Sequence, residues 1–120
     1  MVHDIQERTF RFGVRVVKMA VGLPKTRIAD TLGRQLVRSG TSIGANVEEA
    51  SAAYSREDFV YRLNIALKEA RETHYWLRMI RSCELSGSDG LDAIIEESEQ
   101  VKKILGAIVS NSRKNSRKHA

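Results

Sequence analysis

The sequence predicts an all-α fold, an up-down-up-down antiparallel four-helix bundle. Apolar residues recur every three or four positions through four long stretches, the spacing of one face of an α-helix. A single Pro and eight Gly in 120 residues are too few turn residues for a sandwich or barrel of many strands. Because the links are short, consecutive helices should run antiparallel. We therefore expect one bundle domain over residues 1–112, followed by a basic, disordered tail over 113–120.

The first helix, expected at about residues 4–22, carries two apolar stripes. At 100° per residue, one stripe comprises Ile5, Phe12, Val16 and Met19. The second lies well apart from it and comprises Phe10, Val14, Val17 and Val21. A bundle core needs one stripe, so we expect the second to face a neighbouring subunit.

The second helix, expected at about residues 25–54 after Pro24, combines an apolar stripe with small residues. The stripe opens with Ile28 and Leu32 and continues through Leu36, Ile43, Val47, Ala50 and Tyr54. Gly40 and Gly44 lie beside it, and each interior Gly costs a helix about 1 kcal/mol relative to Ala. Close packing of another helix is the best explanation for these glycines, which indicate assembly before chemistry.

The third helix is expected at residues 56–83 and the fourth at 89–111. Ser55 and Asp58 have the spacing of a capping box, and a turn-rich cluster at 86–90 separates the two helices. The main seam of the third helix comprises Phe59, Leu63, Ala66, Leu67, Ala70 and Leu77, with a second stripe of Tyr61, Ile65, Trp76 and Met79. The fourth repeats in heptad-like fashion at Leu91, Ile94, Ser98, Val101, Leu105 and Ile108.

Charge is divided along the chain. Residues 1–44 contain eight Lys/Arg and three Asp/Glu, residues 45–112 contain eight and twelve, and residues 113–120 contain four and none. These regions could pair with one another in an assembly or present basic surfaces to a polyanion, and a solvated face is the simpler interpretation of each charge run. The candidate nucleic-acid-binding residues are Arg8, Arg11, Arg15, Lys18, Arg34, Arg38, Arg113, Lys114, Arg117 and Lys118.

Several function classes are not supported by the sequence. Cys83 is the single cysteine, so the chain has no internal disulfide and no cysteine metal cluster. Glu72 and His74 are two residues apart, which is not the Glu-x-x-His spacing of a di-iron bundle, and no phosphate-binding loop or catalytic triad motif is present. No apolar run approaches the roughly 18 residues of a membrane span. We therefore expect a cytoplasmic protein with no metal, no cofactor and no enzymatic activity.

A further set of residues is predicted to serve structure or oligomer contacts. Asn46 lies at the edge of the apolar stripe, where an unpaired amide would cost roughly 1–3 kcal/mol, so we expect it to bond Ser42 or Glu69. The residues assigned to this role are Gly40, Ser42, Gly44, Asn46, Glu49 and Trp76.

The run from Arg38 to Ala50, with Asp58-Phe59, residues 65–73 and Trp76-Leu77, resembles the 23S rRNA-intervening sequence protein family. The resemblance implies a bacterial four-helix bundle that assembles as a ring of five and has no assigned activity. It also implies kinship with the accessory variability determinant of diversity-generating retroelements, a basic barrel that works with a reverse transcriptase and RNA.

Together these observations predict an oligomeric, non-enzymatic interaction module, a homopentamer on the family resemblance. Its basic surfaces would bind RNA, DNA or a ribonucleoprotein by electrostatic attraction to phosphates. The alternative is a protein scaffold or adaptor without a nucleic-acid role, and a reverse transcriptase is one protein partner that the resemblance suggests.

Overall fold

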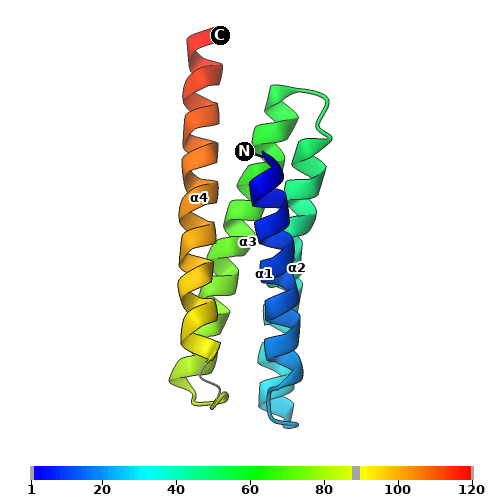
Figure 1. Ribbon diagram of the computed structural model, residues 1–120, viewed down its shortest axis with the longest axis vertical. Coiled ribbons are helices and arrows are strands. Elements are labelled where there is room, and N and C mark those ends of the chain that lie inside the picture. Colours follow the sequence, from blue (N-terminus) through cyan, green and yellow to red (C-terminus); the bar gives the residue numbers. More distant parts are fainter. Residues whose placement is uncertain (1, 88–89, 120) are drawn as a thin grey trace.

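The computed structural model describes the backbone of residues 2–87 and 90–119, and the side chains of residues 4–87 and 90–115. It contains four helices: α1 (Val2–Val21), α2 (Arg27–Ser51), α3 (Arg56–Ser82) and α4 (Gly90–His119). They run alternately up and down in a rod of 52 × 21 × 20 Å, with the start of α1 and the end of α4 toward the same end of the rod (Figure 1). No strand occurs in the described backbone, so the predicted all-α bundle is confirmed.

Side-chain caps set where α2 and α3 begin. The Thr26 hydroxyl accepts a hydrogen bond from the Ala29 N–H at 3.2 Å, and α2 therefore starts at Arg27, two residues after the predicted start. The Ser55 hydroxyl accepts from the Asp58 N–H at 3.1 Å, which confirms the predicted start of α3 at Arg56.

The α2–α3 connection corrects one prediction. α2 ends at Ser51 rather than near residue 54, because the chain turns at Ala52 to reach the Ser55 cap. Tyr54, predicted to extend the apolar stripe of α2, therefore lies outside the helix and is fully exposed. Ile28, predicted to open the same stripe, is 65 % exposed and lies outside the core.

α3 ends in a left-handed turn that the sequence did not reveal. Glu84 has φ of 56°, a conformation that usually selects glycine. The Leu85 N–H donates to the Ile80 carbonyl and the Glu84 N–H to the Arg81 carbonyl, which is the hydrogen-bond pattern of a Schellman motif. This turn reverses the chain toward α4.

α4 continues to His119, eight residues beyond the predicted end at 111. The predicted disordered tail over 113–120 is therefore helical up to His119. Residues 111–118 repeat Asn-Ser-Arg-Lys twice without Pro or Gly, so nothing in this segment breaks a helix. The predicted start of α4 at residue 89 lies outside the described residues.

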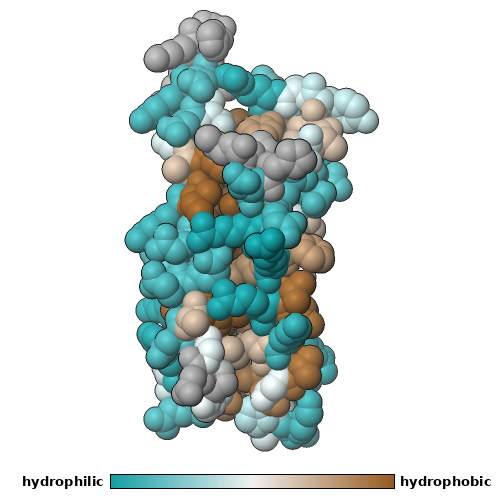
Figure 2. All heavy atoms as spheres, viewed as in Figure 1, coloured by the Kyte–Doolittle hydropathy of each residue, from teal (hydrophilic) through white to brown (hydrophobic). Residues whose placement is uncertain are grey.

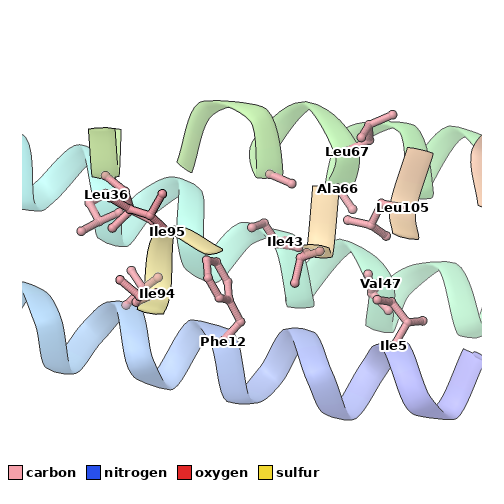
Figure 3. Packing of buried hydrophobic residues seen from close by; sticks show 14 of the residues in the cluster. Ile5, Phe12, Leu36, Ile43, Val47, Ala66, Leu67, Ile94, Ile95 and Leu105 are labelled. Atoms are coloured by element: carbon pink, nitrogen blue, oxygen red, sulfur yellow. The ribbon is translucent and has the colours of Figure 1, made fainter. Parts of the chain in front are cut away.

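The core lies between the four helices and is almost entirely aliphatic (Figure 3). Phe12 from α1 and Ile43 from α2 are 1 % and 0 % exposed, and Ile94 and Leu105 of α4 close the same cluster. The predicted core stripe of α1 is thus correct. α2 and α3 pack along their length, whereas α1 contacts α4 much less than it contacts α2.

Candidate interaction surfaces

Three glycines bring the backbones of α1 and α2 into close contact. A Cβ at Gly40 would lie 2.7 Å from Val16 Cγ1, and a Cβ at Gly44 would lie 3.4 Å from the Thr9 carbonyl carbon and oxygen. On the α1 side, Gly13 lies opposite the Gly40 carbonyl. The close-packed neighbour predicted for Gly40 and Gly44 is therefore α1 of the same chain.

The outer side of this helix pair carries an apolar stripe. Phe10 and Val21 are 66 % and 68 % exposed, and Val14 and Val17 are 38 % and 39 % exposed. Phe10, Val14 and Val17 line a groove of about 490 Å³ between α1 and α2. The rest of its lining includes Gly13, Thr41, Gly44 and Ala45. Apolar surface is visible along the right-hand edge over these helices (Figure 2). We call Phe10, Val14, Val17 and Val21 the α1 stripe.

Two members of the predicted basic row on α1 are held by carboxylates. Arg8 Nε and Nη2 donate to the two carboxylate oxygens of Glu97 on α4 at 2.8 and 2.9 Å. Burial opposes the charge on Glu97, but the Arg8 hydrogen bonds outweigh it and lower the pKa of that carboxyl. Arg11 pairs with Glu7 one turn earlier on the same helix at 3.0 Å.

The other two cations of the row remain available. Arg15 and Lys18 are exposed, and neither forms an ion pair with any side chain that the structure describes. Arg15 is near enough to Glu97 to help lower the pKa of that carboxyl. The phosphate-binding surface predicted on α1 is therefore reduced to Arg15 and Lys18.

The two candidates on α2 are also paired. Arg34 bonds Asp30 at 2.7 Å within the helix, and Arg38 reaches across to Glu69 and Glu72 of α3. The hydrogen bond from Arg38 lowers the pKa of Glu72. Burial raises the pKa of Glu69, and the nearby negative charge of Glu72 adds to this effect. Arg38 lies 3.4 Å away and opposes the rise only in part.

The remaining structural candidates lie on the same α2–α3 side. Asn46 Nδ2 donates to the Ser42 carbonyl at 2.9 Å, so the predicted pairing is made within one helix and not between helices. Ser42 in turn donates to the Arg38 carbonyl, and half-buried Trp76 donates to Glu72 at 3.3 Å. Glu49 is exposed. A buried hydrogen bond from Thr73 to Ser39 at 2.9 Å ties α2 to α3 beneath this surface, a contact that the sequence did not indicate.

The basic residues of α4 are only partly described. Arg113 and Lys114 are exposed and have no carboxylate partner among the described side chains. The side chains of Arg117 and Lys118 lie outside the described residues. Every residue after Glu99 is neutral or basic, so this end of α4 can present positive charge.

A cleft between α1 and α4 is the surface that the sequence did not predict. It measures about 630 Å³, and its apolar wall comprises Ile5, Phe59, Leu63, Ile104, Ala107 and Ile108. Asp4, Asn111, Ser112 and Asn115 form much of its polar rim. The hollow is visible in the upper half of the molecule beside α4 (Figure 2). Periodicity places these residues on helix faces but cannot show that α1 and α4 pack loosely there. We call this feature the α1–α4 cleft.

The α3–α4 contact contains a histidine beside charged groups. His74 Nε2 lies 3.1 Å from Glu99 Oε2, and Lys102 Nζ lies 3.0 Å from the same oxygen. Burial lowers the pKa of His74, as does the positive charge of Lys102, and the attraction of Glu99 only partly opposes them. Within the described part of the chain, no group of three or more His, Cys, Asp or Glu is arranged to hold a metal ion.

These features define a small four-helix bundle protein with exposed apolar surfaces and with several cations that lack an ion-pair partner among the described side chains. Over residues 2–107 the sequence matches the profile of the 23S rRNA-intervening sequence proteins, and the chain belongs to this family. A crystal structure of a protein of unknown function from the S23 ribosomal protein family of Bacteroides thetaiotaomicron is similar. It is 38 % identical with a TM-score of 0.83, and the match covers 91 % of this chain and 97 % of that chain.

Among curated proteins, none matches the sequence. In the described residues, no helix is both long enough and apolar enough to span a membrane.

Proposed function

We propose that this protein is a self-assembling, non-enzymatic interaction module whose copies pack through the α1 stripe. The observation that carries the proposal is the exposure of four apolar side chains on one face of α1, on the side away from the core cluster. Phe10 and Val21 are 66 % and 68 % exposed, and Val14 and Val17 are still 38 % and 39 % exposed, so a contact that covers this face removes further apolar surface from water and favours association.

The dimensions of the rod support a second copy as the occupant of the α1 stripe. A stable interface takes roughly 800 Å² from each partner. A long side of the 52 × 21 × 20 Å rod offers about this area, whereas its ends are too small. Side-by-side rods are also the arrangement that would build the ring of five implied by the family resemblance.

The proposal is tested by the mass of the particle in solution. Light scattering and native mass spectrometry of the wild type should give a multiple of the 13.5 kDa chain mass, five copies for the ring. Phe10→Asp should reduce it to the chain mass, because a carboxylate would be buried in the contact. The control is Tyr54→Asp, which changes a fully exposed side chain at the α2–α3 turn and should keep the wild-type mass. A wild type that remains a single chain at micromolar concentration contradicts the proposal.

We propose nucleic-acid binding as a second function of the assembly. It is supported by the free cations Arg15 and Lys18 on one face of α1 and Arg113 and Lys114 on α4. Repetition of this set in each copy would multiply the phosphate contacts without any new residue. Since no aromatic platform accompanies these cations, the binding would be electrostatic with little base preference.

Salt and charge reversal test this second function. Affinity for RNA or DNA should fall steeply as salt rises from 50 to 200 mM, because bound cations release counterions from the phosphates. Arg15→Glu with Arg113→Glu should abolish the binding, and neither residue lines the groove beside the α1 stripe. The matched control, Arg71→Glu with Arg78→Glu, reverses two exposed cations of α3 and should preserve most of it. Salt-independent binding, or an assembled protein that binds no nucleic acid, favours the protein scaffold without a nucleic-acid role.

A further inference from the structure

The α1–α4 cleft leads from the surface to the core. The most buried part of its wall is Ile5 and Leu63, which are 4 % and 2 % exposed and belong to the core cluster. Phe59, Ile104 and Ile108 also line it and are only half-buried against that cluster. An apolar molecule in the cleft completes the burial of these three side chains. The volume of about 630 Å³ lies in the range of natural ligand pockets, roughly 300–1,000 Å³.

The cleft is too narrow to admit a helix. The α4 residues that line it run from Ile104 to Asn115, which spans about 16 Å at 1.5 Å per residue. Over this length, 630 Å³ corresponds to a mean cross-section of about 40 Å². A helix with its side chains is about 10–12 Å across and needs about twice that cross-section. The occupant is therefore a thinner molecule.

The chemistry of the wall favours a hydrocarbon chain over an extended peptide. An extended peptide would place backbone N–H and C=O groups against Ile, Leu, Phe and Ala side chains, where they lose water without gaining partners. The backbones around the cleft are helical, so their own hydrogen bonds are made within each helix. A hydrocarbon chain has no such groups, and each CH₂ that leaves water favours its binding.

The rim indicates the charge of the head group. Asp4 is exposed and has no ion-pair partner among the described side chains. Arg8, the one cation among the described lining residues, already binds both carboxylate oxygens of Glu97. The other polar side chains of the rim are neutral and form no hydrogen bond with a described residue: Asn111, Ser112 and Asn115. A head group that donates hydrogen bonds and carries positive charge suits this rim better than an anionic one.

We propose that the α1–α4 cleft binds an amphiphile with a single hydrocarbon chain and an amine head group. The chain lies against Ile104 and Ile108, and the amine lies at the rim. This site does not depend on self-assembly, because the cleft and the α1 stripe lie on different sides of α1. Arg8 lines the cleft and Phe10 belongs to the stripe, and their spacing places them about 200° apart around the helix.

Binding of dodecylamine to the intact protein tests the inference. Native mass spectrometry, at concentrations below those at which the amine aggregates, should show one amine bound to each chain. Decylamine and octylamine should bind more weakly, by roughly fourfold for each CH₂ removed. Dodecanoate has the same chain length with a negative head and should bind more weakly than dodecylamine, and Asp4→Asn should narrow this difference. Affinity that does not depend on chain length, or a carboxylate that binds as well as the amine, overturns the inference.

Matched substitutions locate the bound chain. Ala107→Trp places a large side chain in the cleft and should lower the affinity for dodecylamine by roughly tenfold or more, because several CH₂ groups lose their place. Circular dichroism of this variant should match the wild type, since Ala107 is exposed. The control Ala93→Trp changes an exposed position of α4 that does not line the cleft, and it should bind like the wild type.

A variant of the α1 stripe separates this site from the proposed self-assembly. Phe10→Asp should bind dodecylamine like the wild type, because Phe10 does not line the cleft. If Phe10→Asp loses the amine while Ala107→Trp keeps it, the amine covers the α1 stripe and the inference is wrong. A wild type that remains a single chain and still binds one amine contradicts self-assembly and supports the cleft site.

Discussion

The helix α1 meets its two neighbours in different ways. Against α2 it packs backbone to backbone, with Gly13, Gly40 and Gly44 at the contact. Against α4 it is held by the Arg8–Glu97 ion pair, and the apolar surfaces on either side of that pair separate into a cleft. The α1–α2 contact depends on close packing of small residues. The α1–α4 contact combines shared core residues with an ion pair and leaves a cleft. One bundle of this size can therefore contain a pair of helices in close backbone contact and another pair that are separated by a cleft.

The stability of the fold should be most sensitive to a change in side-chain volume at the α1–α2 contact. Gly40→Val should destabilise the fold by roughly 2–3 kcal/mol, because even a Cβ there would lie 2.7 Å from Val16 and the β-branched side chain cannot turn away. Gly106→Val is the matched control within α4, where a Cβ would meet nothing within 4 Å, and it should change stability by less than about 0.5 kcal/mol. Urea unfolding measures the stability of both variants, and equal losses of stability would mean that the α1–α2 contact is not close-packed.

Substitutions at the α1–α4 contact should reduce stability less, and their effect should depend on charge. Arg8→Gln should cost about 1 kcal/mol, since it leaves Glu97 without its bidentate partner at a site where the carboxylate is 20 % exposed. Arg11→Gln is the control, because the Arg11–Glu7 pair is 74 % and 61 % exposed and should contribute little. Hydrogen exchange should locate the loss in α4, and equal exchange in both variants would contradict this role of Arg8.

Acid should weaken the α1–α4 contact and leave the α1–α2 contact unchanged. The pKa of Glu97 lies below its ordinary 4.5 in the folded protein, chiefly because of the Arg8 hydrogen bonds. Its stabilising contribution is therefore complete above pH 4.5 and is lost as the pH falls through the lowered value. Exchange in α4 should rise in this range, and Glu97→Gln should remove that part of the pH dependence. If hydrogen exchange in α4 of Glu97→Gln has the same pH dependence as in the wild type, the Arg8–Glu97 ion pair is not its cause.

The smallest expected effect concerns the α3–α4 contact near neutral pH. The folded protein lowers the pKa of His74 below 6.5, mainly through burial, so the unfolded chain binds a proton first as the pH falls. Stability should therefore decrease on acidification from pH 6.5 down to the lowered pKa, after which this contribution is constant. Thermal unfolding of His74→Gln should lack this step, and an unchanged slope would exclude His74 as its origin.

Much of the fold could be predicted from local spacing. Phe12 and Val16 on one face of α1 and Phe10 and Val14 on another follow from 100° per residue, and their burial and exposure agree. Ser55 also marks the start of α3, because a cap is a contact between residues three positions apart. Tyr54 was misassigned since its spacing continues the stripe, while the chain had already turned.

The candidate sites were predicted less well, because charge alone does not reveal its partner. Arg8 and Arg15 are equivalent in the sequence pattern, yet only Arg8 forms hydrogen bonds with Glu97. Glu97 lies 89 residues further along the chain, so local spacing could not reveal this pair. Gly40 likewise indicated a close neighbour without indicating which helix, and the structure shows α1 of the same chain.

The sequence by itself determined the number, order and inner faces of the helices, because apolar periodicity and capping act between residues a few positions apart. Only the tertiary structure decided which cations are neutralised, which helix meets the glycines and where α1 and α4 separate. Those features depend on distances between elements that are remote in sequence, and one pattern of residues is compatible with several such distances.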